Sequence, residues 1–210
     1  GPLTFAVWMK ADTLGGGTNA RGRIVDKGVF AGGCGLYLHS TTANSLEFSC
    51  DYTTLDVFRR TAANTVTLGA WQHVALTWDG SATAANVKIY LNGQETTYSV
   101  TANGSGTRNS DAVKDLLIGN SSGFNRGFDG ILDEVRIYNR VLSPTEITEL
   151  YNSGTGGGDT QAPSVPTSLT ATAVSSSQIN LSWNASTDNV GVAGYRIYRG
   201  GVEIATVTSG

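Results

Sequence analysis

Short runs of alternating apolar and polar residues, separated by turn residues, make up most of this chain. Strict alternation is typical of a strand that buries one face of a sheet. The segments with this pattern are 3–10, 23–27, 34–39, 46–52, 55–60, 71–78, 87–91, 94–100, 116–119 and 131–138. In the last of them, Ile131, Asp133, Val135 and Ile137 are predicted to share one face. The sequence therefore predicts an all-β fold.

One short helix is predicted directly after the 131–138 strand. Ser143 and Glu146 have the spacing of a capping box, and Pro144 suits the first helical turn. An apolar side follows at helical spacing, formed by Ile147, Leu150 and Tyr151. A strand followed at once by a short surface helix is typical of the closing segment of a two-sheet sandwich.

The 34–52 region predicts a hairpin whose turn lies near 41–43. This register places Leu38 opposite Leu46, Leu36 opposite Phe48, and Cys34 opposite Cys50, all on one face. Cys34 and Cys50 would then be direct cross-strand neighbours, a geometry that a disulfide can meet. The alternative is a pair of small buried thiols, as expected in a reducing compartment.

The opposite face of the same strands carries polar and aromatic residues, and a nearby loop carries more. The candidate ligand-binding residues are Tyr37, His39, Glu47, Phe58 and Arg60 on the strands, and Phe124, Asn125 and Arg126 in the 120–129 loop. Aromatic faces and planar polar groups are what carbohydrate sites use. The alternative is that the strand face is simply the solvated side of a sandwich.

Composition narrows the classes of function. The 210 residues suit one domain of about 150 residues and a smaller piece. The formal net charge is −3 and no run of Lys and Arg occurs, so no nucleic-acid partner is expected. No apolar run approaches the roughly 18 residues that span a bilayer, so no membrane insertion is expected.

Two ordered motifs carry a family resemblance. The first motif is Asp-Glu-Val-Arg at 133–136, with Gly130 before it and Tyr138, Arg140, Leu142-Ser143 and Glu146-Ile147 after it. The second motif is Trp-Gln-His-Val-Ala-Leu-Thr-Trp-Asp at 71–79, followed by Val-Lys-Ile-Tyr-Leu-Asn-Gly at 87–93. Together they resemble the laminin-G-like, concanavalin A-like jelly rolls of secreted proteins. The resemblance implies a jelly-roll β-sandwich with one short C-terminal helix over 1–153. Similar domains usually begin with a further strand, which is expected to be missing here.

The composition changes after this domain. Residues 154–161 form a Gly-rich linker. Residues 162–210, with Ile-Asn-Leu-Ser-Trp at 179–183 and Gly-Tyr-Arg-Ile-Tyr-Arg at 194–199, resemble the opening strands of a bacterial fibronectin type III domain, with Trp183 and Tyr195 at core positions. We therefore expect a truncated fibronectin type III domain, which is an immunoglobulin-like β-sandwich.

The two resemblances imply a non-catalytic carbohydrate-binding module of an extracellular, secreted or cell-surface multimodular protein. It would target an attached enzyme to a polysaccharide or glycan, beside neighbouring domains of a longer chain. One alternative is a cell-surface adhesion or spacer module that binds protein. Another is a jelly-roll glycoside hydrolase or polysaccharide lyase, but the adjacent Asp133 and Glu134 are expected on opposite faces of their strand, so no catalytic residues are assigned.

Calcium is the one metal that the resemblance implies. Many similar domains hold a structural Ca²⁺ near the Asp-Glu pair, and Ca²⁺ takes six to eight oxygen ligands. Asp133 is the candidate ligand, and the alternative is that it accepts hydrogen bonds from the backbone or from an arginine. The two histidines and the cysteine pair lack zinc-site spacing, so zinc is not expected.

Overall fold

The computed structural model describes residues 1–15, 21–39, 44–154, 162–188, 192 and 194–207. The chain divides into two compact units, 1–157 and 158–210. Among the described residues, no helix is long and apolar enough to cross a bilayer.

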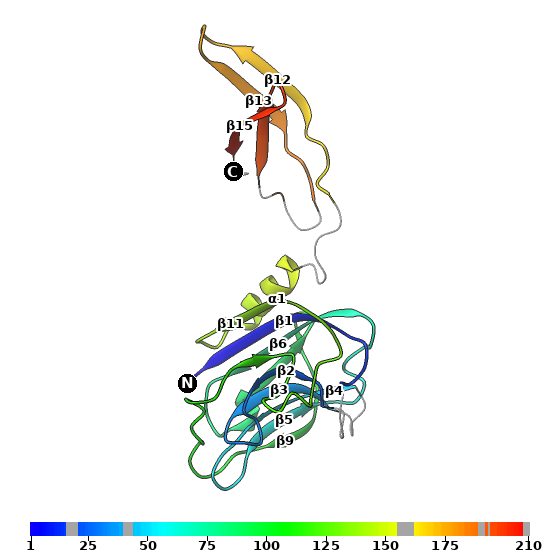
Figure 1. Ribbon diagram of the computed structural model, residues 1–210, viewed down its shortest axis with the longest axis vertical. Helices are drawn as coiled ribbons and strands as arrows, with labels where there is room; N and C mark the ends of the chain where they lie inside the picture. The colour runs from blue at the N-terminus through cyan, green and yellow to red at the C-terminus, as the bar shows by residue number, and fades with distance from the viewer. Residues whose placement is uncertain (16–20, 40–43, 155–161, 189–191, 193, 208–210) are drawn as a thin grey trace. The chain divides into compact units, whose positions relative to one another are not determined.

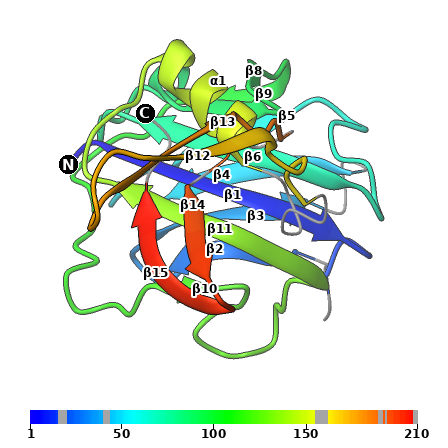
Figure 2. The same cartoon turned by 90° about the horizontal axis from the view of Figure 1, so that it is seen from above.

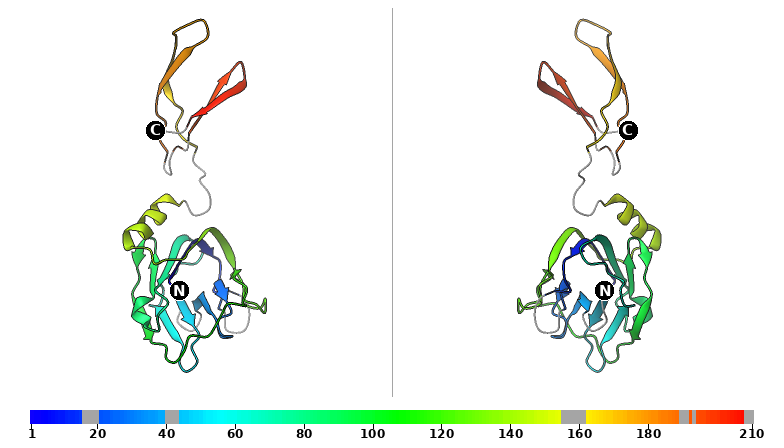
Figure 3. Two further views of the ribbon diagram at one scale, coloured as in Figure 1. Left: turned by 90° about the vertical axis from the view of Figure 1, so that its left-hand side faces the viewer. Right: turned by 90° about the vertical axis from the view of Figure 1, so that its right-hand side faces the viewer.

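The first unit is a sandwich of two antiparallel sheets that lie face to face (Figure 3). The five-stranded sheet has the order β11 (Gly130–Tyr138), β1 (Leu3–Ala11), β6 (Trp71–Trp78), β7 (Lys88–Leu91), β8 (Gln94–Glu95). The six-stranded sheet has the order β10 (Leu117–Ile118), β2 (Arg23–Lys27), β3 (Cys34–His39), β4 (Ser45–Cys50), β5 (Val57–Thr61), β9 (Tyr98–Ala102). A 3-10 helix, η1, spans Ala84–Asn86. The predicted all-β jelly roll is confirmed.

The core lies between the two sheets and takes alternate side chains from each. Phe5, Val7 and Met9 of β1 are buried there together with Leu36 of β3 and Phe48 of β4, as the alternation predicted. Aromatic rings join the layers as well, because the Phe48 and Trp78 ring centroids lie 5.2 Å apart. Burial of this apolar surface is the main stabilising contribution to such a sandwich.

The β3–β4 hairpin has the predicted register. Leu38 pairs with Leu46, Leu36 with Phe48, and Cys34 with Cys50. The two cysteines form a disulfide with a sequence separation of 16 residues. The predicted turn near 41–43 lies outside the described residues.

The predicted alternation along β11 is wrong. Ala6 of β1 pairs with Arg136, but Trp8, only two residues further along β1, pairs with Asp133, so β11 contains a bulge. Glu134 sits in this bulge with a φ of +49°. An extra residue in one strand reverses the alternation on its far side. Asp133 therefore lies opposite Trp8 whereas Ile137 lies opposite the core residue Phe5, and the two do not share a face.

Because of the bulge, strict alternation no longer places Asp133 and Glu134 on opposite faces of their strand. That prediction relied on strict alternation, which holds only in a regular strand. The residues before and after the bulge pair normally with β1, so the interruption of the strand pairing is local.

The helix α1 (Pro144–Ser153) begins at the predicted capping box. The Ser143 hydroxyl accepts a hydrogen bond from the Glu146 amide at 3.3 Å, and a Glu146 carboxylate oxygen accepts one from the Ser143 amide at 2.8 Å. The helix lies on the outer side of the five-stranded sheet (Figures 1 and 2), over β1, β6 and β7. The residues that join helix and sheet are Ala6, Ala75, Tyr90, Leu142 and Ile147.

The second unit contains two antiparallel strand pairs. One pair is β12 (Thr167–Ala173) with β13 (Ile179–Asn184), and the other is β14 (Tyr195–Arg199) with β15 (Val202–Val207). The rings of Trp183 and Tyr195 pack edge to face with centroids 5.2 Å apart. Several large apolar side chains of this unit stay exposed, including Leu169 at 67% and Val202 at 65%. Most of the predicted linker, 155–161, lies outside the described residues.

Candidate ligand-binding face

The five candidate strand residues do come together on the outer face of the six-stranded sheet, which we call the polar face. Glu47 of β4 pairs with Tyr37 of β3 on one side and with Arg60 of β5 on the other. Phe58 pairs with Ser49 on the same sheet, and His39 is the last residue of β3. The alternation of three neighbouring strands is sufficient to gather these side chains on one face.

Most of these residues lie beneath the surface instead of on it. Tyr37, His39 and Glu47 are only 0%, 1% and 4% exposed, so they are neither a solvated face nor a surface for direct ligand contact. The Tyr37 hydroxyl donates to Glu47 Oε1, and Arg60 Nε donates to Glu47 Oε2 at 2.5 Å. His39 Nε2 lies 3.7 Å from the same carboxylate. Glu47 is thus the centre of a buried polar network.

Burial sets the protonation states of this network. Desolvation, followed by the neighbouring Glu47 carboxylate, raises the pKa of Tyr37 far above that of a free phenol. Desolvation also lowers the pKa of His39, against the opposing effect of Glu47. Tyr37 is therefore a neutral hydrogen-bond donor at neutral pH, and His39 is uncharged.

The surface above this network is formed by residues that the sequence analysis missed. Phe30 is 48% exposed, and its ring packs edge to face on Tyr37 with centroids 5.9 Å apart. The Arg23 guanidinium carbon lies 4.2 Å from the centroid of the Tyr37 ring, and that of Arg21 lies 5.9 Å away. Arg23 begins the predicted 23–27 strand and Arg21 lies two residues before it, and in extended backbone this spacing could have placed both on one face.

The 120–129 loop contributes only part of what was predicted. Arg126 reaches the polar face, where its guanidinium carbon lies 5.7 Å from the Phe30 ring centroid. Phe124 is 76% exposed, and the Asn125 side chain accepts a hydrogen bond from Ser121 at 3.1 Å. The loop is thus divided between a residue on the polar face and an aromatic ring that points into solvent.

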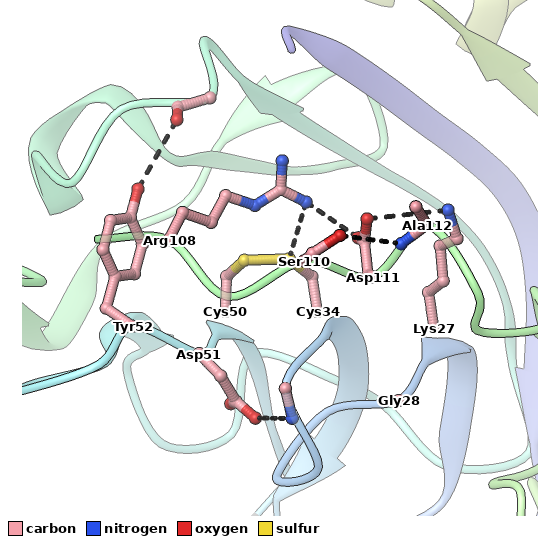
Figure 4. Close-up of polar contacts among 12 residues, drawn as sticks. Lys27, Gly28, Cys34, Cys50, Asp51, Tyr52, Arg108, Ser110, Asp111 and Ala112 are labelled. Carbon is pink, nitrogen blue, oxygen red and sulfur yellow. Dashed lines mark hydrogen bonds and ion pairs between the residues drawn. A yellow bond between two sulfur atoms is a disulfide. The ribbon is translucent and has the colours of Figure 1, made fainter.

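The disulfide end of the sandwich holds a second polar cluster (Figure 4). Arg108 extends across the Cys34–Cys50 bridge, where its Nη2 donates to Asp111 at 2.8 Å and lies 3.4 Å from Cys34 Sγ. Lys27 Nζ lies 3.7 Å from the same aspartate. A cavity of about 90 Å³ and a more open hollow of about 690 Å³ both adjoin these residues. The contacts of Arg108 with the disulfide and with Asp111 hold this end of the sandwich together.

The Asp133 carboxylate accepts a hydrogen bond from the Glu134 amide at 2.8 Å. In the described part of the chain, no group of three or more His, Cys, Asp or Glu side chains is close enough to hold a metal ion. Backbone carbonyl oxygens are also calcium ligands. A structural calcium ion at Asp133 stays a prediction.

Known proteins resemble this chain in parts. A segment of 52 residues, 25% of this chain, is 62% identical to chitinase A1 of Niallia circulans and spans only 7% of that enzyme. A segment of 64 residues, 30% of this chain, is 44% identical to exoglucanase B of Cellulomonas fimi and spans 6% of that enzyme. The chain thus spans a small fraction of the curated relatives it matches.

The fold has counterparts among solved structures. The CBM40 of the Ruminococcus gnavus IT-sialidase, bound to α2,3 sialyllactose, superimposes with a TM-score of 0.53 at 16% identity, over 71% of this chain and 82% of that one. At this identity the likeness concerns the fold. The family model described as the concanavalin A-like lectin/glucanases superfamily matches residues 1–148. The chain therefore belongs to the concanavalin A-like lectin/glucanases superfamily.

Proposed function

We propose that the first unit is a non-catalytic carbohydrate-binding module and that the polar face is its binding surface. The observation that carries this proposal is the half-exposed Phe30 ring, surrounded by arginine side chains on a sheet face. An exposed aromatic ring can pack against the apolar side of a pyranose, while planar guanidinium groups donate hydrogen bonds to its oxygens.

The same face argues against catalysis. A glycosidase needs two carboxyl groups that reach the scissile bond from either side. Glu47, the carboxylate at the centre of the polar face, is 4% exposed and already accepts hydrogen bonds from Tyr37 and Arg60. It therefore supports the face and does not reach a substrate.

The proposed setting is an extracellular, multimodular protein that acts on a polysaccharide. The similarity of short segments to a chitinase and an exoglucanase supports this setting. The second unit would be the N-terminal part of a fibronectin type III domain, supported by its strand pairs and by the Trp183–Tyr195 packing. The mechanism would be targeting, because a bound module raises the local concentration of an attached catalytic domain at the polymer.

A binding assay with the 210-residue chain tests this proposal. Polysaccharide and glycan arrays, probed with and without EDTA, are expected to show binding to one polymer class. Loss of binding in EDTA would support the calcium ion proposed at Asp133. If the folded protein binds no glycan in either condition, the carbohydrate proposal is abandoned in favour of an adhesion or spacer module.

Two matched variants locate the surface. Phe30 and Phe124 are both exposed phenylalanines with positive φ, at +62° and +51°. Asn tolerates this conformation, so Phe30→Asn and Phe124→Asn each remove a ring without adding strain. We expect Phe30→Asn to abolish binding and Phe124→Asn to preserve it. The opposite result would move the binding surface to the 120–129 loop.

A further inference from the structure

Three arginines converge on Phe30 at the edge of the polar face. Their guanidinium carbons lie 5.4, 5.3 and 5.7 Å from the Phe30 ring centroid, for Arg21, Arg23 and Arg126 respectively. Arg23 is the first residue of β2 and Arg21 lies two residues before it, whereas Arg126 comes from the loop before β11. A backbone hydrogen bond of 3.0 Å from the Arg23 amide to the Arg126 carbonyl joins the two segments. The fold therefore fixes this cluster.

The cluster carries an excess of positive charge. Arg23 forms an ion pair with Asp26 at 2.9 Å, and both side chains are buried. Arg21 and Arg126 form no ion pair within the described residues, so two guanidinium groups of the cluster lack a carboxylate partner, although the whole chain has a net charge of −3. Burial lowers the pKa of Arg23, Asp26 opposes this effect, and Arg126 and Arg21 lower the pKa further. The three cations thus repel one another in a partly desolvated place.

Three hydrogen-bond donors of the cluster also lack an acceptor among the described residues. Arg21 Nε, Arg23 Nη1 and Arg126 Nη1 are buried and have no hydrogen-bond partner within the described ranges. Unpaired buried donors are uncommon and destabilising in folded proteins. The side chains of Arg21 and Arg126 are only half-buried, so a ligand at the surface can reach them. An anionic group placed beside their exposed atoms would compensate the positive charge of the cluster.

Phe30 is held rigidly beside these cations. Its amide donates to Asp51 Oδ1 at 3.2 Å, and the Gly32 amide donates to Asp51 Oδ2 at 2.6 Å. A φ of +62° is uncommon for a bulky residue and is unfavourable without such support. The loop therefore maintains an unfavourable conformation that leaves an aromatic ring half exposed to solvent.

From this geometry we infer that the ligand is an acidic saccharide, with its carboxylate or sulfate group between the guanidinium groups of Arg21 and Arg126 and its ring packed on Phe30. The inference rests on the proposed function and adds the charge class of the ligand. Arg23 is buried and serves as a positioning residue under the Phe30 ring. Guanidinium groups suit this task because they pair bidentately with carboxylate and sulfate oxygens.

The first test compares polymers by affinity electrophoresis of the 210-residue chain. Alginate and polygalacturonate carry carboxylates, ι-carrageenan carries sulfates, and cellulose, chitin and starch are neutral. We expect binding to at least one acidic polymer and a marked weakening as NaCl rises from about 0.05 M to about 0.5 M. The two acidic classes separate a carboxylate from a sulfate ligand.

The second test changes the cluster itself. Arg126→Gln is expected to weaken binding to the acidic polymer at least about tenfold, because a charge-assisted hydrogen bond is lost. Arg126→Lys keeps the charge but not the fork geometry and is expected to give an intermediate loss. Arg199→Gln makes the same change of charge at an exposed residue of the second unit and is expected to leave binding unchanged. Circular dichroism confirms that each variant is folded.

The outcomes separate this inference from the function on which it rests. Binding to neutral polymers alone, with Arg126→Gln unaffected, would overturn the inference and preserve the carbohydrate-binding function. Equal binding of an acidic polymer by Arg126→Gln and Arg199→Gln would also overturn it, because the cluster would then be structural. If the folded wild-type chain binds no polymer, both proposals are rejected.

Discussion

The two outer faces of the sandwich are covered in different ways. The helix α1 covers the outer face of the five-stranded sheet, and Trp8 of this sheet stacks on Tyr151 of the helix with ring centroids 5.7 Å apart. On the six-stranded sheet, loops and arginines cover a buried polar network and leave Phe30 half exposed. The outer face of the five-stranded sheet, which α1 covers, is called the closed face below. The polar face instead presents charged and aromatic side chains.

This difference indicates where function lies. The closed face buries His73 beside both Trp8 and Tyr151, at ring-centroid distances of 5.6 and 6.2 Å. Substitutions there should change stability without changing ligand binding. On the polar face, removing one partner of a buried ion pair leaves an uncompensated buried charge, so substitutions there should affect stability and binding together.

The largest expected effect is on the closed face. Trp8→Ala removes a side chain that is only 8% exposed and opens a cavity under α1. Such truncations cost about 3 to 5 kcal/mol of unfolding free energy. Chemical denaturation followed by circular dichroism measures this loss. Glycan binding by the folded fraction is expected to stay unchanged, and a selective loss of binding would contradict the assignment of faces.

The second largest expected effect is a dependence of the free energy of unfolding on pH. Burial, with a smaller contribution from Arg136, lowers the pKa of His73 to about 4 from its ordinary value of 6.5. The unfolded state then binds the proton more readily, so the stabilising contribution is complete above pH 6.5 and is lost as the pH falls towards 4. The shift corresponds to about 3 kcal/mol. Denaturation at a series of pH values measures it.

The control for this prediction is His73→Gln, which removes the titrating group. Its free energy of unfolding should depend less on pH between 6.5 and 4 than that of the wild type. Equal slopes in the two proteins would show that another group is responsible.

A smaller loss is expected on the polar face. Glu47→Gln keeps the side-chain shape but removes the charge that accepts from Tyr37 and Arg60, at a cost of about 2 kcal/mol. Because Tyr37 supports Phe30, binding should weaken as well. Glu95→Gln is the control, since its ion pair with Lys88 is partly exposed and contributes less than about 1 kcal/mol. A destabilised Glu47 variant with unchanged binding would separate the buried network from the binding surface.

Local patterns were enough to determine much of the fold. Alternation predicted the strands, the β3–β4 register placed Cys34 opposite Cys50, and the Ser143–Glu146 spacing predicted the start of α1. These features depend on residues close in sequence or on the period of a single strand. The same patterns also gathered Tyr37, Glu47 and Arg60 on one face.

Only the tertiary structure decided how deep those residues lie and what covers them. Alternation gives the face of a side chain, but its exposure depends on loops distant in sequence, such as the one that brings Arg126 beside Phe30. The β11 bulge escaped prediction because it is a property of the pairing with β1. The sequence by itself therefore determined the strands and their faces, and long-range packing determined which residues remain accessible to a ligand.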